Sequence, residues 1–249
     1  MSSYLFIDVE TTSLSKEHGA IIELAAIPVI NGQQLEPFHS MIKPHDGAAL
    51  DPKSFEITKI DINSINSFPD AKDVLNEFIK WVDSHETLFS LAGHNIGFDR
   101  GFLFRLFNRH GEHSSFVNRF RPNDLDTLSL SRSFFKRARN KPVDFKLESI
   151  CRYFGIEVGV SHRAMEDITN TIKIYEELEK LIEEKEIKKD SLNFQEKKRK
   201  YMDKTYIHFY EDGGYYVPAS TRNNLTASRF ILNQIWEMDC VGIKTVSEM

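Results

Sequence analysis

The sequence has little cysteine: Cys151 and Cys240 are the only two among its 249 residues. Two cysteines cannot supply a disulfide framework or a four-ligand structural zinc site. The sequence also lacks any run of residues long and apolar enough for a signal sequence or a membrane span. We therefore expect a cytoplasmic protein that does not associate with a membrane.

Positive charge is not in excess either, because the formal net charge at pH 7 is −5. This balance argues against wrapping of nucleic acid over the whole surface, but it allows a local site in which metal ions carry the positive charge. A hydrophobic content of 41% is that of a globular protein rather than of a disordered chain. The length suffices for one domain of ordinary size and a substantial appendage.

Strand patterns come first in the chain and helical patterns follow. An Asn31-Gly32 pair indicates a hairpin between the second and third strands, whereas the segment after Pro52 has little periodicity. We expect strands at residues 3–9, 20–30, about 35–43 and 88–92, and helices at 70–84, 97–108, 125–135, 147–154 and 164–181. This order predicts an α/β fold in which helices cover a sheet and catalytic groups lie at strand ends and helix starts.

The composition changes after about Ile182, where lysine and glutamate become frequent. We predict a main domain at residues 1–186 and a small α+β extension at 187–249. The extension contains a basic run at 197–200, a hairpin at 205–217 and an amphipathic helix at 226–238. The basic run either follows the phosphates of a nucleic acid or is ordinary solvated surface, and the sequence leaves both open.

Two acids interrupt an apolar strand near the N-terminus, in the stretch FIDVETTSL at residues 6–14. Because side chains alternate along a strand, Asp8 and Glu10 point to one face while Ile7 and Val9 point to the other. Two carboxylates this close repel each other unless a cation lies between them or they share a proton. Solvation at an exposed strand end is the alternative, and this stretch alone does not decide.

Two further acids stand where helices are expected to begin. Asp99 ends the stretch HNIGFD, directly after the strand at 88–92, and Asp167 ends HRAMED, five residues after His162. Taken singly, Asp99 is explained by the dipole of its helix, and His162 by capping or packing. Only the combination of these stretches with FIDVETTSL points to a shared site.

Together, DVETT, HNIGFD and HRAMED resemble the three motifs of the DEDDh, or DnaQ-like, 3′–5′ exonucleases, the superfamily of RNase T and the DNA polymerase III epsilon subunit. The resemblance covers approximately residues 3–182. It implies a ribonuclease H-like fold, a mixed sheet flanked by helices, with two divalent metal ions and a histidine as general base. The implied metal ligands are Asp8, Glu10, Asp99 and Asp167, and the implied base is His162. Carboxylates are hard oxygen ligands that suit Mg²⁺ or Mn²⁺ rather than zinc.

The resemblance also implies contacts to the terminal nucleotide. The backbone amides of Thr11 and Thr12 are expected to meet it, and Asn95 and Phe98 to line the pocket for its sugar and base. For Phe98, packing in the core of the protein is an equal alternative to stacking on a base.

The expected activity is metal-dependent hydrolysis at the 3′ end of single-stranded or frayed DNA, with release of nucleoside 5′-monophosphates. An RNA-trimming exonuclease of the RNase T or oligoribonuclease type is the alternative, because the sequence does not reveal discrimination of the 2′-hydroxyl group. A binding or scaffold module that has lost catalysis is a third reading, disfavoured because all five catalytic positions are filled. A polymerase or another replication or repair protein is a candidate partner for the extension, and self-association is another role for it.

Overall fold

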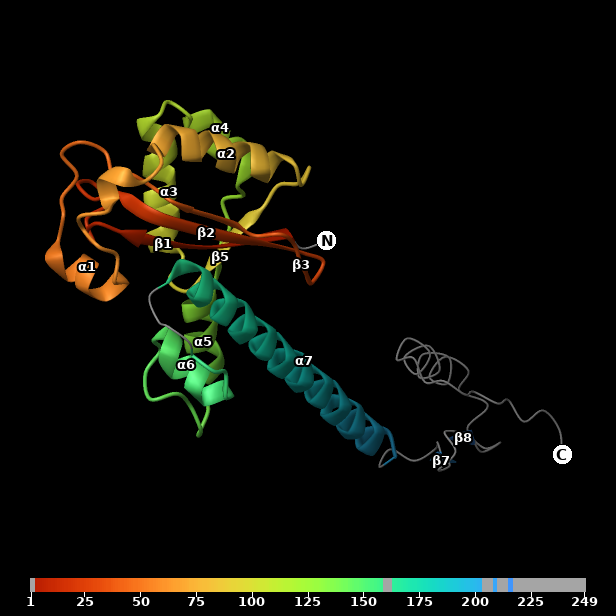
Figure 1. Ribbon diagram of the computed structural model, residues 1–249. Helices are drawn as coiled ribbons and strands as arrows, with labels where there is room; N and C mark the ends of the chain where they lie inside the picture. Colours follow the sequence, from red (N-terminus) through yellow and green to blue (C-terminus); the bar gives the residue numbers. More distant parts are fainter. Residues whose placement is uncertain (1–2, 159–162, 203–207, 210–214, 217–249) are drawn as a thin grey trace. The chain divides into compact units, whose positions relative to one another are not determined.

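The computed structural model describes the backbone of residues 3–158, 163–202, 208–209 and 215–216, and the side chains of residues 3–158 and 163–187 (Figure 1). A six-stranded mixed sheet forms its centre, in the order β3-β2-β1-β5-β6, with β4 also paired to β2. The strands are β1 (Ser3–Thr11), β2 (Ile21–Ile30), β3 (Gln33–Gln34), β4 (Phe38–Met41), β5 (Ser90–Gly93) and β6 (Leu125–Asp126). This mixed sheet with helices on both faces confirms the expected fold class.

β1 lies in the middle of the sheet. It pairs antiparallel with β2 along its whole length and parallel with β5 at Tyr4, Leu5 and Phe6 only. Beyond Phe6 the strand therefore runs past the carboxyl end of β5, and Asp8 and Glu10 belong to this projecting part. Ligand sites of open α/β sheets form at such carboxyl ends.

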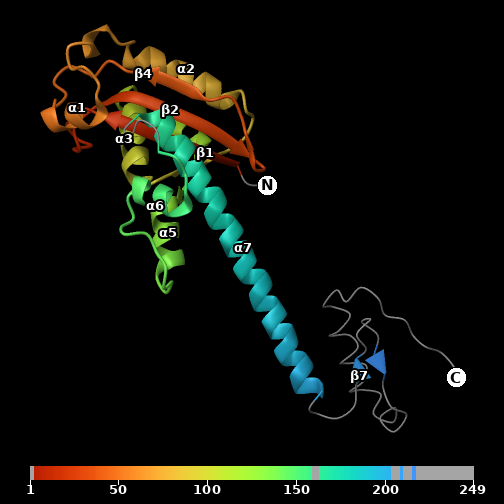
Figure 2. The ribbon, with the colours of Figure 1, turned by 60° about the horizontal axis from the view of Figure 1, so that its bottom comes forward.

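Helices cover both faces of the sheet (Figures 1 and 2): α2 (Ala71–Asp83), α3 (Gly97–Arg109) and α4 (His113–Arg119) lie on one face, and α5 (Thr127–Phe135), α6 (Leu147–Phe154) and α7 (Ala164–Met202) lie on the other. Leu5, Ile7 and Val9 of β1 pack in the cluster that contains α2 and α3, whereas Phe6 packs against Ile168, Ile172 and Tyr175 of α7. Because side chains alternate along a strand, Asp8 and Glu10 share the face of Phe6. That face is the one on which α7 begins.

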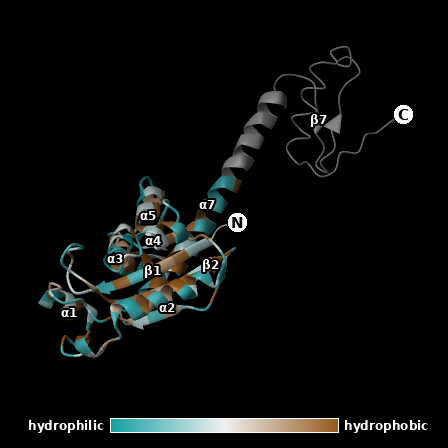
Figure 3. Ribbon diagram, turned by 90° about the horizontal axis from the view of Figure 1, so that it is seen from above, coloured by the Kyte–Doolittle hydropathy of each residue, from teal (hydrophilic) through white to brown (hydrophobic). Residues whose placement is uncertain are grey.

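Two shorter helices, α1 (Pro52–Thr58) and the 3₁₀ helix η1 (Ile65–Ser67), precede α2 in the chain. Asp70 caps α2 by accepting a hydrogen bond from Lys72 N, and Val74, Leu75, Phe78 and Val82 form its buried stripe. Hydrophilic and hydrophobic residues are accordingly interspersed along α2 (Figure 3).

Several expected elements differ from the structure. The helix expected at 125–135 begins at Thr127, because Leu125 and Asp126 form β6 and pair with Ala92 and Gly93. Of the third strand expected at about 35–43, only β4 (Phe38–Met41) forms, while the short β3 precedes the expected range and pairs with another part of β2. The helix expected to end at Leu181 continues to Met202, since lysine and glutamate favour helix. α1 and α4 were not expected.

The chain forms two compact units, residues 1–182 and 183–249. The predicted domain boundary at Glu186 falls inside α7, and the division into an exonuclease domain and an extension stays a prediction. In the second unit β7 (His208–Phe209) pairs antiparallel with β8 (Tyr215–Tyr216), within the expected hairpin, while the turn at 212–214 and the helix at 226–238 lie outside the described residues. Among the described residues, no helix combines the length and the apolar character needed to cross a membrane.

Candidate metal centre and active site

Three carboxylates from two distant parts of the chain meet at the projecting end of β1. Asp8 and Glu10 come from β1, and Asp167 comes from the first turn of α7. One oxygen atom of each carboxylate lies within 4.8 Å of the others, close enough for one cation to touch all three. The structure therefore brings together three of the four predicted metal ligands.

The fourth predicted ligand, Asp99, is held against the backbone of β1. Asp99 lies in the first turn of α3 and is 4% exposed. Its Oδ1 accepts a hydrogen bond of 3.1 Å from the N–H of Val9, the residue between Asp8 and Glu10. This bond fixes Asp99 beside the other acids, although it does not belong to the group of three whose oxygens all lie within 4.8 Å.

The environment of these acids disfavours their charged forms. Burial, followed by the negative charges of Asp99, Glu10 and Asp167, holds the pKa of Asp8 well above its usual range. Burial and the charges of Asp167 and Glu23 raise the pKa of Glu10 to about 8, and burial raises the pKa of Asp99 to about 7. Repulsion of this kind is relieved when a cation joins the group.

The donor set fits a hard divalent cation. Asp8, Glu10 and Asp167 offer carboxylate oxygens only, which suit Mg²⁺ or Mn²⁺ better than zinc. Arg163 lowers the pKa of Glu10, but within the part of the chain that the structure describes its effect is outweighed by burial and by the neighbouring acids. We conclude that this cluster is able to bind a divalent metal.

A fifth acid, Glu23 of β2, completes the surroundings of the cluster. It lies directly opposite Glu10 in the β1–β2 pair, so that both side chains stand on one face of the sheet. Glu23 is 1% exposed; its Oε1 lies 2.8 Å from Nε2 of His39, and its Oε2 lies 3.4 Å from Nε of Arg163. Arg163 immediately precedes α7, so this ion pair ties the beginning of the helix that carries Asp167 to the centre of the sheet.

Glu23 was not among the predicted site residues, although a signal for it is present in the sequence. Glu23 is the single charged residue in the apolar run AIIELAAIPVI at residues 20–30. A lone acid in a buried strand requires a partner, and Arg163 lies 140 positions away in the sequence. Only the fold reveals that partner.

Comparison with known proteins agrees with this arrangement of acids. A model of the RNase T family, described as an exonuclease, matches residues 5–175. The chain belongs to the RNase T exonuclease family. The matched range includes all four predicted metal ligands, and the match confirms the resemblance to the DEDDh exonucleases.

Curated relatives of this RNase T family member are DNA polymerase III PolC-type proteins. The protein from Oceanobacillus iheyensis is 33% identical over 187 residues, which are 74% of this chain and 12% of the relative. The protein from Bacillus subtilis is 32% identical over 169 residues, or 68% of this chain and 11% of the relative. The chain therefore spans only about one eighth of the length of these relatives.

Solved structures with the same fold include two exonucleases I. Escherichia coli Exonuclease I in complex with a dT13 oligonucleotide superposes with a TM-score of 0.60 at 21% identity, over 70% of this chain and 40% of that chain. Exonuclease I of Methylocaldum szegediense gives a TM-score of 0.59 at 21% identity, over 70% of this chain and 39% of that chain. At these identities the likeness shows the fold alone.

The other predicted site residues are His162, Thr11, Thr12, Asn95 and Phe98. His162 lies outside the described residues. Thr11 is 5% exposed and donates its hydroxyl hydrogen to Ser13 O. The Thr12 N–H donates to Ala20 O and its Oγ1 accepts from Ala20 N, so the expectation that the Thr12 amide meets a nucleotide is not supported.

Asn95 lies in the turn between β5 and α3, and Phe98 is the second residue of α3. Asn95 is exposed and has a positive φ of 69°, a conformation that asparagine adopts more readily than most residues. Its N–H donates to Oδ1 of Asp126 at 2.8 Å. Phe98 is half-buried, and its ring centroid lies 4.9 Å from that of Phe102, so core packing accounts for part of the ring while the rest stays accessible.

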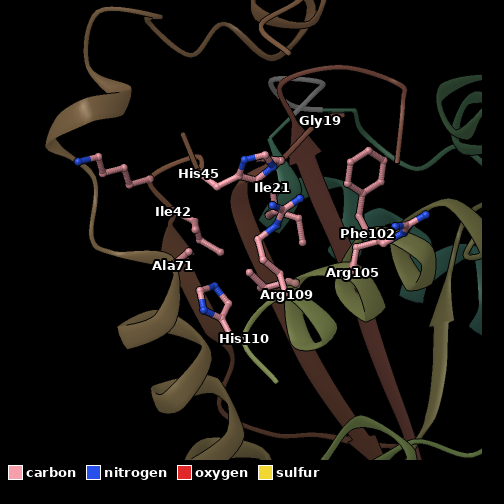
Figure 4. Close-up of a pocket in the computed structure, with 12 residues that line it drawn as sticks. Gly19, Ile21, Ile42, His45, Ala71, Phe102, Arg105, Arg109 and His110 are labelled. Carbon is pink, nitrogen blue, oxygen red and sulfur yellow. The ribbon is translucent and has the colours of Figure 1, made fainter. Parts of the chain in front are cut away.

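Two cavities within the described residues differ in what they can hold. The first, lined by residues of β2, the loop after β4, and α3, has a volume of about 30 Å³, which suffices for a water molecule or two but not for a nucleotide (Figure 4). The second lies between α5 and the loop 141–146 and has a volume of about 550 Å³. Only the second reaches the size range of ligand pockets, roughly 300–1,000 Å³.

Proposed function

We propose that this RNase T family member is a divalent-metal-dependent 3′–5′ exonuclease that hydrolyses terminal phosphodiester bonds of single-stranded or frayed DNA and releases nucleoside 5′-monophosphates. The cluster of Asp8, Glu10 and Asp167, whose oxygens lie within 4.8 Å of one another, carries this proposal. Buried acids that raise one another's pKa values are difficult to explain in a scaffold module, because such a module gains nothing from their repulsion.

DNA is the proposed substrate, on the strength of the relatives. The curated relatives are named as DNA polymerases, and the solved structures of the same fold include a complex with a dT13 oligonucleotide and one with dA16. The present chain corresponds to a small part of each polymerase relative, so the polymerase activity itself is not carried over.

In this proposal four acids bind metal ions and a histidine transfers a proton. Asp8, Glu10, Asp99 and Asp167 would hold two cations, Mg²⁺ or Mn²⁺. When bound, such ions lower the pKa of water and stabilise charge on the oxygens around phosphorus. His162 would take the proton of the attacking water, a role that requires the neutral imidazole. Thr11, Asn95 and Phe98 would contact the terminal nucleotide.

The experiment that tests this function is product analysis on single-stranded DNA and RNA of one sequence, labelled at the 5′ end. The protein is incubated with Mg²⁺, with Mn²⁺ or with EDTA, beside the Asp167→Ala variant. A ladder that shortens from the 3′ end, with a divalent metal and intact Asp167 only, is the expected result. Faster loss of RNA than of DNA would replace the DNA assignment by the RNA-trimming alternative, and cleavage in EDTA would overturn the metal-dependent mechanism.

The C-terminal extension is proposed to contact a polymerase or another replication or repair protein. A chain truncated after residue 202 keeps the whole of α7 and removes the rest of the extension. If truncation lowers affinity for oligonucleotide, the extension binds substrate instead; if it changes only the oligomeric state, the extension serves self-association.

A further inference from the structure

We propose that the cavity between α5 and the loop 141–146 binds the phosphodiester backbone of the single strand, on the 5′ side of the bond that is cut. This inference rests on the proposed exonuclease function and adds a second contact region for its substrate. The cavity has a volume of about 550 Å³, which accommodates a nucleotide unit.

The lining of the cavity is basic in a protein that is acidic overall. Arg132 from α5 and Lys141 and Lys146 from the loop contribute three positive charges, against the single carboxylate of Asp144. All three cationic side chains are exposed, and none of them forms an ion pair within the part of the chain that the structure describes. Since the whole chain has a net charge of −5, this local excess is a distinct feature that suits a polyanion.

The cavity also has apolar surface beside its charges. Val143, at 94% exposed, is the most exposed large hydrophobic residue among those whose side chains the structure describes, and Leu128 and Phe145 line the same cavity. Positive groups that follow a backbone, combined with apolar or aromatic surface for bases, are typical of sites that bind single strands without reading their sequence.

A single histidine attaches this loop to the turn that leads into the acidic cluster. Nε2 of His94 lies 2.9 Å from Phe145 O, and Nδ1 lies 3.0 Å from Oγ1 of Thr127. His94 follows β5 directly, and Asp99 lies five residues later in the first turn of α3, so one short segment connects the basic cavity with one of the four proposed metal ligands. A strand whose 3′ end occupies the carboxylate site can therefore pass its preceding phosphates along Arg132 and Lys141.

The test is a charge-removal pair with a matched control. Arg132→Ala/Lys141→Ala removes two exposed cations from the cavity, and Lys53→Ala/Lys80→Ala removes two exposed lysines from α1 and α2. Steady-state kinetics are measured on a single-stranded DNA 12-mer, and on the 4-nitrophenyl ester of thymidine 5′-monophosphate, which is too short to reach the cavity. Binding of a labelled 12-mer in EDTA is measured by fluorescence anisotropy between 50 and 300 mM salt.

For the cavity variant we expect both KM and Kd for the 12-mer to rise about tenfold, while kcat on the ester stays unchanged. The slope of log Kd against log salt should become smaller by about 1.4, since each contact to a single-strand phosphate contributes about 0.7. A change in KM and salt slope no larger than that of the control pair would overturn the cavity assignment. A loss confined to an RNA 12-mer would also overturn it, because a backbone site treats both sugars alike.

The two proposals fail differently. If the wild-type protein cleaves neither the strand nor the ester, the exonuclease function fails. Anisotropy on the uncleaved 12-mer still decides the cavity, because binding weakened by the cavity variant alone supports the site and equal binding of all variants refutes it.

Discussion

Glu23 shows how one buried side chain can affect a cluster of acids to which it does not belong. It is buried at 1% exposure, faces Glu10 across two paired strands, lies 2.8 Å from Nε2 of His39 and forms an ion pair with Arg163. Its charge adds to the repulsion among the acids, as the raised pKa values of Asp8 and Glu10 show, and at the same time it holds the residue that precedes α7. Glu23 therefore fixes the position of Arg163 but raises the electrostatic free energy of the acidic cluster.

We predict that Glu23→Gln keeps the fold, lowers the free energy of unfolding by about 1–3 kcal/mol and lowers kcat about tenfold. The loss follows because the neutral amide no longer attracts Arg163, and the start of α7, with Asp167, is held less firmly. The divalent-metal concentration for half-maximal activity should rise several-fold. Metal titrations of activity and urea unfolding measure these effects.

The exposed Glu56 provides the matched control, since Glu56→Gln makes the same change in charge on α1. Glu23→Asp should restore part of the activity if the ion pair with Arg163 is what matters. Equal metal dependence for Glu23→Gln and Glu56→Gln would show that Glu23 has no positioning role.

Asp99 permits a test in which charge and shape are separated. Asp99→Asn keeps an oxygen that can accept the hydrogen bond from Val9 N, while the charge is lost. We predict at least a 100-fold fall in kcat, because loss of a direct metal ligand should exceed the 10–100-fold typical of residues behind the ligands. Single-turnover cleavage measures the fall, and circular dichroism checks the fold. Activity within tenfold of wild type would remove Asp99 from the proposed ligand set.

Among the elements, α5 matters to the site through its first residues. Asp126 caps α5 by accepting from Leu128 N, and the same carboxylate accepts from Asn95 N in the turn between β5 and α3. Asp70 caps α2 through Lys72 N in the same way. The two aspartates thus share one structural role, but only Asp126 is connected to the turn that carries Asp99.

We predict that Asp126→Ala and Asp70→Ala each lower the free energy of unfolding by about 1 kcal/mol, as loss of an N-cap does. Only Asp126→Ala should also reduce activity, by about tenfold or more, because it removes the hydrogen bond that Asn95 N donates to Asp126 in the turn before α3. Chemical unfolding and exonuclease assays on both variants make the comparison. Equal activity of the two variants would mean that the bond between Asp126 and Asn95 does not position the site.

The elements themselves were predictable where a local pattern determined them. α2 and α6 have apolar residues at helical spacing, and β1 and β2 are bounded by turn residues, so their expected and observed bounds nearly coincide. β6 was not predictable, because its two residues are a strand only through pairing with β5. The acids of the site were predictable as motifs, whereas Glu23 and the basic cavity depend on contacts between distant residues.

At the scale of the whole molecule, the sheet order brings the site together. β1 supplies Asp8 and Glu10, β5 leads into the helix that carries Asp99, and α7 returns across the face of Phe6 to deliver Asp167. The tight cores on both sides of β1 stabilise a cluster of acids that repel one another. The protein without metal should therefore be less stable than its packing alone would suggest.

The repulsion among these buried acids predicts that the stability of the metal-free protein falls as the pH rises. The pKa of Glu10 rises from its ordinary value of 4.5 to about 8, and that of Asp99 from 3.8 to about 7. A carboxylate with a raised pKa binds more protons in the folded than in the unfolded chain, so its stabilising contribution is complete below about pH 4 and is lost as the pH rises to about 8. In EDTA the free energy of unfolding should fall by up to about 1.4 kcal/mol per pH unit for each acid that ionises.

Urea unfolding between pH 5 and 8.5, in EDTA and in 5 mM Mg²⁺, measures this dependence. Mg²⁺ should reverse the loss, because the cation binds the ionised carboxylates of the folded chain. Burial lowers the pKa of His94, which acts in the opposite direction near neutral pH, so the comparison of interest is wild type against Glu10→Gln. The variant should show a shallower fall in EDTA and a smaller gain from Mg²⁺. If the wild-type protein in EDTA instead gains stability from pH 5 to 8, the acids are compensated within the protein and the case for a metal between them is lost.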